Sequence, residues 1–249
     1  MTTLRAPAKV TRYLEVTGRR EDGLHELRSE MVTVDLADTL DVDERASYLR
    51  VLDSSGAVPD DDTNLVARAL HLVGRRAGVT VRKAIPVGGG LGGGSADAGA
   101  ILRWAGGVSH ERALSLGSDV PFCQVGGRAL VEGVGERVTP LAFERRDLTL
   151  ILAPFGVDTR ACYQAYDEMR ARGWTPPGSN HLEEPATRVE PRLAVVLAWL
   201  RAELGVAVNL AGSGSTLFVE GHPMGGAAPH SLISPVGLLR TLATSTTLE

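Results

Sequence analysis

The chain has 249 residues, of which 43% are hydrophobic, so it is long enough to bury a sizeable core in one large domain or two modest ones. Its 26 lysines and arginines and 30 aspartates and glutamates give a formal net charge of −4. Because this balance provides no overall basic field, we exclude nucleic acid and an anionic membrane surface as expected partners.

The cysteines and the N-terminus indicate a reducing compartment. Cys123 and Cys162 are too few for a disulfide framework, and their apolar or aromatic neighbours favour buried thiols. Residues 1–5 lack the apolar segment of a signal peptide, and no apolar run approaches membrane-spanning length. We expect a cytoplasmic protein that acts on a small molecule, as a monomer or a weak homodimer.

The first predicted elements are two strands and a helix. Residues 32–36 and 39–42 have the alternating pattern of strands. Apolar residues at helical spacing then predict a helix over residues 64–73, which Asp62 and Thr63 can cap.

A glycine-rich loop follows a short predicted strand at residues 79–81. Six of the seven residues from Gly88 to Gly94 are glycine, and a helix of mostly small residues is predicted from Ser95 to Trp104. Glycine accumulates where the backbone must bend or approach a ligand closely. Successive N–H groups in such a loop, together with the positive end of a helix, form an anion site. The loop therefore predicts phosphate binding, and with it nucleotide binding.

Two common phosphate-binding motifs fit this loop poorly. A P-loop would end in Gly-Lys-Ser/Thr, but the nearest lysine, Lys83, precedes the glycines. The Gly-x-Gly-x-x-Gly motif of dinucleotide-binding proteins matches by spacing, with Glu111 about twenty residues downstream as the ribose contact. However, Pro86 interrupts the exit from the half-polar strand 79–81, where that motif requires a buried strand.

The second half of the chain begins with a new apolar strand. We place a domain boundary near residue 147, where this strand starts, and a Gly/Pro-rich joint at residues 173–178. The later elements suit a small α+β layer that also contains an earlier helix. Strands of this layer are predicted at residues 148–153, 206–208 and 216–219, and its main helix is predicted at residues 192–203.

The loop Pro-Val-Gly-Gly-Gly-Leu-Gly-Gly-Gly-Ser resembles the ATP loop of the GHMP kinases, the galacto-, homoserine, mevalonate and phosphomevalonate kinases. Four further segments carry the resemblance, in the family's order across nearly the whole chain: residues 6–9, 22–27, 117–122 and 211–215. Within the family, the chain is most similar to the isoprenoid-pathway kinases whose acceptor is a cytidine-diphosphate sugar alcohol.

The resemblance implies an α+β, two-domain GHMP kinase fold. Its N-terminal ATP-binding domain, of the ribosomal protein S5 domain 2-like type, would cover residues 1–147. A ferredoxin-like C-terminal domain would cover residues 148–249.

ATP, as MgATP, is the implied phosphoryl donor. Asn64 sits where the family contacts adenine, and the Ser95 hydroxyl would contact a phosphate or the Mg²⁺. The simpler alternative for Ser95 is a helix N-cap. The implied phosphate loop comprises Pro86, Val87, Gly88, Gly89, Gly90, Leu91, Gly92, Gly93, Gly94, Ser95 and Ala96.

Two residues match the family's catalytic pair. Asp119 would accept the proton of the substrate hydroxyl or orient that hydroxyl, and Lys9 would neutralise charge that develops on the transferred group. By itself, Asp119 in Ser-Asp-Val-Pro could equally cap a helix, and Lys9 could be a surface lysine that begins a strand.

The acceptor side departs from the family at two positions. Thr11 stands where asparagine is usual, which keeps a hydroxyl donor but loses the amide's two-sided hydrogen bonding. Leu24 stands where the family has a tyrosine that stacks on cytosine, and leucine has no π-face. The resemblance assigns the next residue, His25, to the edge of the cytosine.

Three residues of the second half complete the implied acceptor site. Tyr163 falls at the other aromatic wall of the cytosine pocket, although a helix aromatic packed in the second domain is nearly as well supported by spacing. Gly212 and Ser213 match the family's second glycine-rich loop, for which the alternative is a tight turn before a strand.

The resemblance therefore implies an ATP-dependent kinase that phosphorylates a hydroxyl of a cytidine-diphosphate sugar alcohol. One alternative is a sister GHMP kinase that acts on another small alcohol. A second is a non-catalytic nucleotide or sugar sensor on the same fold, although both Lys9 and Asp119 are present. A dehydrogenase is a more distant alternative.

Overall fold

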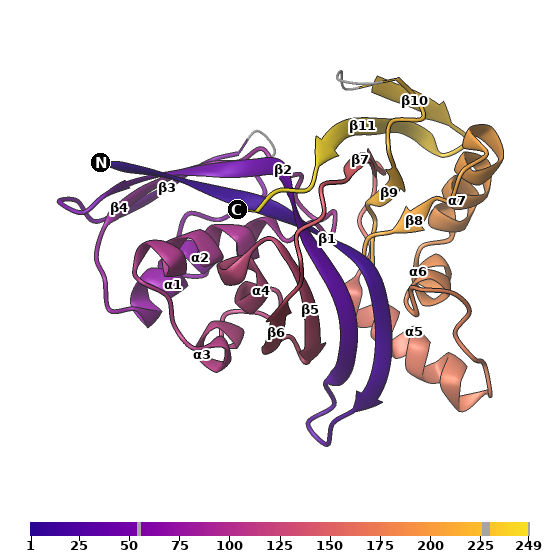
Figure 1. Ribbon diagram of the computed structural model, residues 1–249, viewed down its shortest axis with the longest axis horizontal. Helices are drawn as coiled ribbons and strands as arrows, with labels where there is room; N and C mark the ends of the chain where they lie inside the picture. Colours follow the sequence, from indigo (N-terminus) through magenta and orange to yellow (C-terminus); the bar gives the residue numbers. More distant parts are fainter. Residues whose placement is uncertain (54–55, 226–229, 249) are drawn as a thin grey trace.

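The structure is a computed structural model that describes residues 1–53, 56–225 and 230–248. Helices and strands are both present, and the strands form two sheets, one from each half of the chain (Figure 1). The predicted α+β class is therefore confirmed. In the described part of the chain, no helix is long and apolar enough to cross a membrane.

The first sheet comes from the first half of the chain. Its strands are β1 Thr2–Arg19, β2 His25–Asp43, β3 Tyr48–Leu52, β4 Gly78–Arg82, β5 Arg128–Gly133 and β6 Arg137–Pro140. Their order is β3-β4-β2-β5-β6, with β1 paired antiparallel to β2 along most of its length. The predicted strand at residues 79–81 is confirmed as part of β4.

The two strands predicted at residues 32–36 and 39–42 are in fact parts of the single strand β2. The two predicted strands are separated only by Ala37 and the polar residue Asp38. In the structure Asp38 is fully buried and pairs in register with Ala6. Its carboxylate accepts hydrogen bonds from the backbone N–H groups of Ala84 and Ile85. A satisfied polar side chain does not end a strand.

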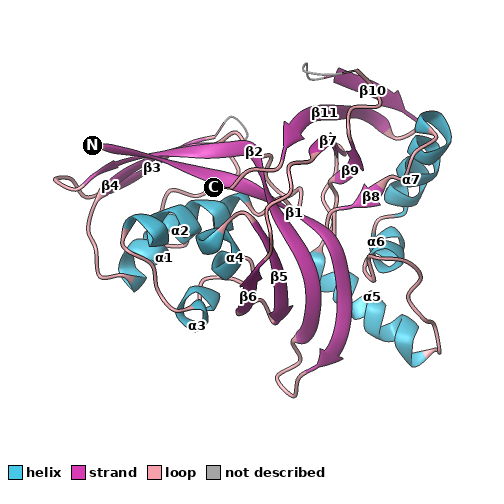
Figure 2. Ribbon diagram, viewed as in Figure 1, coloured by secondary structure: helices cyan, strands magenta, loops and turns pink. Residues whose placement is uncertain are grey.

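Four helices gather on one side of the first sheet (Figure 2): α1 Leu65–Leu72, α2 Gly93–Trp104, α3 His110–Leu114 and α4 Val120–Val125. The small residues of α2 allow α4 to pack closely on it. A Cβ added to Gly99 would lie only 2.6 Å from the carbonyl carbon of Cys123. Cys123 and Cys162 are both free and buried, so the predicted buried thiols are confirmed.

Both predicted helix starts need correction. Asn64, not Asp62 or Thr63, is the N-cap of α1, and its Oδ1 accepts the Val66 N–H at 2.8 Å. Helix α2 begins at Gly93 rather than Ser95, so Ser95 lies in the first turn and is not the N-cap. That position belongs to Gly92, whose φ of 70° only glycine adopts at little cost.

The second sheet comes from the second half of the chain. The elements of this half are β7 Asp147–Leu152, α5 Thr159–Ala171, α6 Glu183–Val189, α7 Pro191–Leu204, β8 Asn209–Leu210, β9 Leu217–Glu220, β10 His230–Ser234 and β11 Gly237–Ser245. The strands are ordered β10-β11-β7-β9-β8, all antiparallel.

The predicted elements of this half are present at β7, α7 and β9, with ends shifted by one residue. The strand predicted at residues 206–208 is wrong. Helix α7 ends in a left-handed Gly205, and only Asn209 and Leu210 come into register with β9. The sequence analysis assigned neither α6 nor the β10-β11 hairpin.

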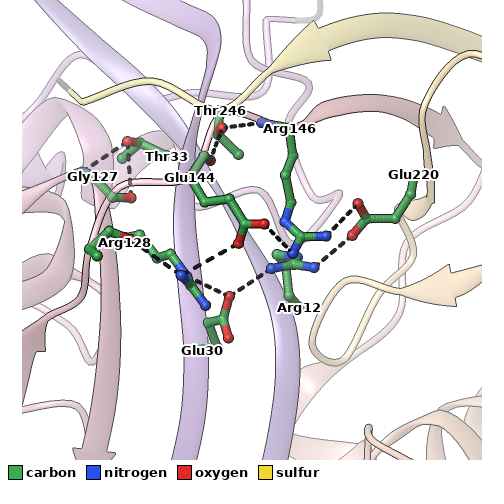
Figure 3. Close-up of polar contacts among 10 residues, drawn as sticks. Arg12, Glu30, Thr33, Gly127, Arg128, Glu144, Arg146, Glu220 and Thr246 are labelled. Carbon is green, nitrogen blue, oxygen red and sulfur yellow. Dashed lines mark hydrogen bonds and ion pairs between the residues drawn. The ribbon is translucent and has the colours of Figure 1, made fainter.

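An ionic network joins the two halves (Figure 3). The guanidinium of Arg12 on β1 contacts Glu30 on β2 and Glu220 on β9, each at 2.7 Å. Arg146, beside the proposed boundary at residue 147, contacts the other oxygen of Glu220 at 3.1 Å. The network therefore connects β1 and β2 of the first sheet to β9 of the second.

Two further contacts cross between the halves. Leu14, near the end of β1, packs with Tyr166 and Leu182 of the second half. In the opposite direction, the chain beyond β11 returns to β2, where the N–H of Thr247 donates to the carbonyl of Thr33 at 3.0 Å. The β1-β2 hairpin thus runs from the core of the first half to the helices of the second (Figure 1).

Candidate active site

Lys9 and Asp119 form an ion pair at the centre of the molecule. Lys9 lies on β1 and is 6% exposed, and its Nζ is 3.2 Å from Asp119 Oδ2. Thr11, two residues along the strand, lies on the same face, and its Oγ1 is 3.2 Å from the same Nζ. Lys9 is therefore not a surface lysine.

Asp119 stands at the N-cap position of α4, yet its side chain does not cap the helix. Its carboxylate is directed to Lys9 instead, and it is 29% exposed. A partly exposed carboxylate beside a buried ammonium can orient or deprotonate a hydroxyl that enters from solvent. The alternative of a simple capping aspartate does not describe this geometry.

The glycine-rich loop passes directly over Lys9. The N–H of Lys9 donates to the carbonyl of Leu91 at 3.0 Å. A Cβ added to Gly92 would lie 2.9 Å from Lys9 Cγ. Any larger residue at Gly92 would therefore displace the lysine, so the end of the loop and the ion pair form one unit.

The N-terminus of α2 has no capping side chain. The other helices of at least eight residues, α1, α5 and α7, are capped by Asn64, Asp158 and Glu190. The first N–H groups and the positive dipole end of α2 therefore remain available, and they point toward the loop that precedes the helix. This end of α2 can hold an anion beside Lys9.

The second glycine-rich loop packs against the first. A Cβ added to Gly90 would lie 2.6 Å from the carbonyl oxygen of Gly214, and the N–H of Thr216 donates to the carbonyl of Gly89 at 3.2 Å. A Cβ added to Gly212 would lie 3.6 Å from Thr11 Oγ1. The residues around Gly212 thus form a turn that lies beside Thr11 and Lys9.

Asn180 supports this second loop, and the sequence analysis did not identify it. Its Nδ2 donates to the carbonyls of Leu210 and Gly212 at 2.9 and 2.8 Å. Ser213 contacts Thr159 of α5 through their hydroxyls at 2.8 Å. No motif marked Asn180, because its role depends on a loop more than thirty residues later in the chain.

His25 on β2 and Tyr163 on α5 lie against each other. Their rings stack with centroids 4.7 Å apart and planes 20° apart. The His25 Nε2 lies 2.7 Å from Oδ1 of Asp167, a residue the sequence analysis did not identify, although it lies one turn after Tyr163 on α5. Leu24 is 53% exposed, so His25 rather than Leu24 faces Tyr163.

The ionisation of Tyr163 connects this aromatic pair to Asp119. Burial raises the pKa of the Tyr163 hydroxyl well above its ordinary value, and the negative charge of Asp119 raises it further. The phenol is therefore neutral at physiological pH, and its ring lies within electrostatic range of the ion pair. The Tyr163 hydroxyl is therefore influenced by the charge of Asp119.

Asn64 lies at the start of α1, beside the start of α2. A Cβ added to Gly94 would lie 3.4 Å from Cδ1 of Leu65, the first residue of α1. Both polar groups of the Asn64 side chain are engaged within the chain, because its Nδ2 donates to the Pro59 carbonyl at 2.7 Å and its Oδ1 caps the helix.

At the other end of the loop, Pro86 and Val87 face the second half of the chain across a cavity of about 250 Å³. The cavity is also lined by residues 152–156 and by Ser215 and Thr216. The loop is therefore open on this side and closely packed near Gly90.

A buried ionic triad lies behind the loop. Lys83, the residue that directly follows β4, contacts both Asp38 and Asp97, and all three side chains are at most 5% exposed. The sequence analysis mentioned Lys83 only to exclude a P-loop. Burial raises the pKa of Asp97 from 3.8 to about 7, although the charge of Lys83 opposes the rise.

We expect Asp97→Asn to change how stability depends on pH. Folded Asp97 keeps its proton up to about pH 7, whereas the unfolded chain loses it near pH 3.8, so this proton's contribution to stability declines as pH rises between the two values. From about pH 6 to pH 8, the wild type should lose about 1 kcal/mol relative to the variant. Urea unfolding across this range measures the difference. Parallel pH profiles would contradict the raised pKa.

The chain is similar to known proteins along most of its length. The family model of the GHMP kinases N terminal domain matches residues 64–127. The 4-diphosphocytidyl-2-C-methyl-D-erythritol kinase of Methylibium petroleiphilum is 36% identical over 241 residues, which cover 86% of this chain and 83% of that protein. The protein of the same name from Clostridium beijerinckii is 35% identical, and that match spans 66% of this chain and 64% of that protein.

A solved structure is similar over nearly the full length. The crystal structure of a 4-(cytidine 5'-diphospho)-2C-methyl-D-erythritol kinase superposes with a TM-score of 0.71 at 34% identity. The superposition covers 98% of this chain and 99% of the other.

Proposed function

Because the chain belongs to the 4-diphosphocytidyl-2-C-methyl-D-erythritol kinase family of GHMP kinases, we propose that Lys9, Asp119 and the glycine-rich loop carry out that family's reaction. ATP would donate its γ-phosphoryl group to the 2-hydroxyl of 4-diphosphocytidyl-2-C-methyl-D-erythritol, an isoprenoid precursor. The observation that carries the proposal is the Lys9–Asp119 pair beside the uncapped start of α2.

In this proposal the residues divide the work of phosphoryl transfer. The N–H groups of the loop and the first turn of α2 hold the ATP phosphates. Asp119 orients the acceptor hydroxyl and takes its proton as the oxygen attacks the γ-phosphorus and ADP leaves. Lys9 lies between the loop and Asp119, so its ammonium can neutralise the charge that spreads over the transferred group.

Mg²⁺, bound with ATP, would supply further neutralisation of the phosphate charge. Ser95 is the candidate for holding it, because its hydroxyl lies in the first turn of α2 and makes no capping bond there. Asn64, at the neighbouring helix start, is proposed to border the adenine. Its amide is already engaged, so we assign it packing against the base rather than a new hydrogen bond.

His25 and Tyr163 are proposed to bind the cytosine, while Thr11, Gly212 and Ser213 border the acceptor hydroxyl. Tyr163 offers an aromatic face, and His25 is held by Asp167. Leu24 would contribute apolar contact at the rim of the site. The exposed position of Leu24 explains how the family's tyrosine can be replaced here without a cavity in the core.

A coupled assay of ADP release tests the proposed function. The purified chain is supplied with MgATP and, separately, with 4-diphosphocytidyl-2-C-methyl-D-erythritol, homoserine, mevalonate and galactose. We expect turnover only with the cytidine substrate. Turnover with another alcohol would favour the sister kinase, and ATP binding without any turnover would favour the sensor.

A further inference from the structure

The phosphate loop is tied at both of its ends to the buried triad Asp38, Lys83 and Asp97. Asp38 Oδ1 accepts the N–H groups of Ala84 and Ile85, at 2.5 and 2.8 Å, and these residues lead into the loop. Lys83 also contacts Asp97 on α2, the helix that leaves the loop, at 2.6 Å.

The ammonium of Lys83 lies directly beneath the start of α2. A Cβ added to Gly93, the first residue of the helix, would lie 3.3 Å from Lys83 Nζ and 3.3 Å from Ile85 Cγ2. Lys83 therefore lies between the residues that enter the loop and the start of α2, the helix end that faces the phosphates.

Stability alone does not explain this arrangement. A buried ion pair is often no more stable than apolar residues of the same volume, because desolvation offsets the attraction. Asp97 also keeps one carboxylate oxygen buried with no hydrogen-bond partner, which is an additional cost. The triad does, however, define one relative position for β2, α2 and the segment that follows β4.

Resting on the proposed function, we propose that Lys83 is a positioning residue for ATP: bridged between Asp38 and Asp97, it sets the spacing of the two ends of the phosphate loop. Lys83 itself touches neither substrate. Its loss should weaken nucleotide binding, while the cytidine side, built from His25 and Tyr163, should be unaffected.

Binding measurements on variants of the full chain separate these sites. The probes are a non-hydrolysable MgATP analogue and cytidine 5'-diphosphate, each measured alone by calorimetry. Lys83→Met is the direct test. Lys83→Met leaves the two buried carboxylates without a cation. The second variant therefore combines Lys83→Met with Asp97→Leu, which removes one of these carboxylates, and this double variant should fold. Lys83→Arg restores a cation that can bridge both carboxylates.

We expect both methionine variants to raise the Kd for the ATP analogue about tenfold or more, while the Kd for cytidine 5'-diphosphate stays within about twofold. Lys83→Arg should recover most of the affinity. The matched control is Arg82→Met, one residue earlier, whose side chain is exposed and paired with Asp41. It should bind both ligands as the wild type does.

Two results would overturn the inference. One is an unchanged affinity for the ATP analogue in the folded double variant, and the other is an equal loss of both ligands, which would indicate a purely structural role. If the wild type itself failed to bind the ATP analogue, the proposed function would fail with it. A wild type that binds while the variants are unaffected would remove only the role of Lys83.

Discussion

Asp119→Asn should lower kcat by about 10²-fold or more while leaving the Kd for MgATP nearly unchanged. Asparagine has the shape of aspartate but cannot take the proton of the acceptor hydroxyl. The groups assigned to the ATP phosphates are backbone N–H groups of the loop and α2, and the substitution does not touch them. Steady-state kinetics with the cytidine substrate, together with calorimetry of the ATP analogue, measure the two effects. Turnover at the wild-type rate would remove Asp119 from the mechanism.

Lys9→Met should act on the same step, because Nζ of Lys9 is 3.2 Å from the Asp119 carboxylate. The double variant should therefore lose much less than the product of the two single losses. Asp35→Asn is the matched control, since Asp35 is an exposed carboxylate that pairs with Arg5 and has no role in the proposed site. Losses that multiply would mean that Lys9 and Asp119 serve separate steps.

Tyr163→Ala should raise the KM for the cytidine substrate about 5- to 150-fold, since stacking of a base on an aromatic ring contributes about 1–3 kcal/mol. The Kd for the ATP analogue should not change. Tyr163→Phe is the matched control, because it keeps the ring beside His25 and removes only the hydroxyl. If the phenylalanine and alanine variants behave alike, the ring is not the source of the affinity.

The same experiment includes Leu24→Tyr, which restores the aromatic residue usual in the family. Leu24 is exposed and adjoins His25 in the chain, so a tyrosine there could reach a base bound at the rim without disturbing the core. We expect KM for the cytidine substrate to fall several-fold, by less than the loss in Tyr163→Ala. If neither variant differs from the wild type, no cytosine binds there, and a sister kinase with another alcohol becomes the better account.

The sequence analysis was most successful for features that depend on contiguous residues. The glycine-rich loop needs several glycines in a row to approach an anion, and that requirement is visible without any fold. Five ordered motifs then indicated the GHMP kinases, and the similarity to the relatives and to the solved structure confirms the family. The choice between Asp119 as a cap and Asp119 as a partner of Lys9 could not be made from its own segment.

The errors arose where a local pattern has two physical explanations. Asp62, Thr63 and Asn64 can all cap a helix, and the preference goes to the residue whose backbone leads directly into the first turn. Asp38 is a polar residue inside β2, and its hydrogen-bond partners Ala84 and Ile85 come from the segment that follows β4. Residues 206–208 have the composition of a strand, but pairing with β9 begins only at Asn209.

What the sequence by itself determined is therefore the α+β class, the buried cysteines and the family, because each depends on residue type, spacing or motif order. Only the tertiary structure decided which side chains meet. Lys9 and Asp119 are 110 residues apart, His25 and Asp167 are 142 apart, and Lys83 joins Asp38 and Asp97 from three separate elements. Such contacts depend on how β1, β2 and α5 pack, and packing is set by the whole core rather than by any one segment.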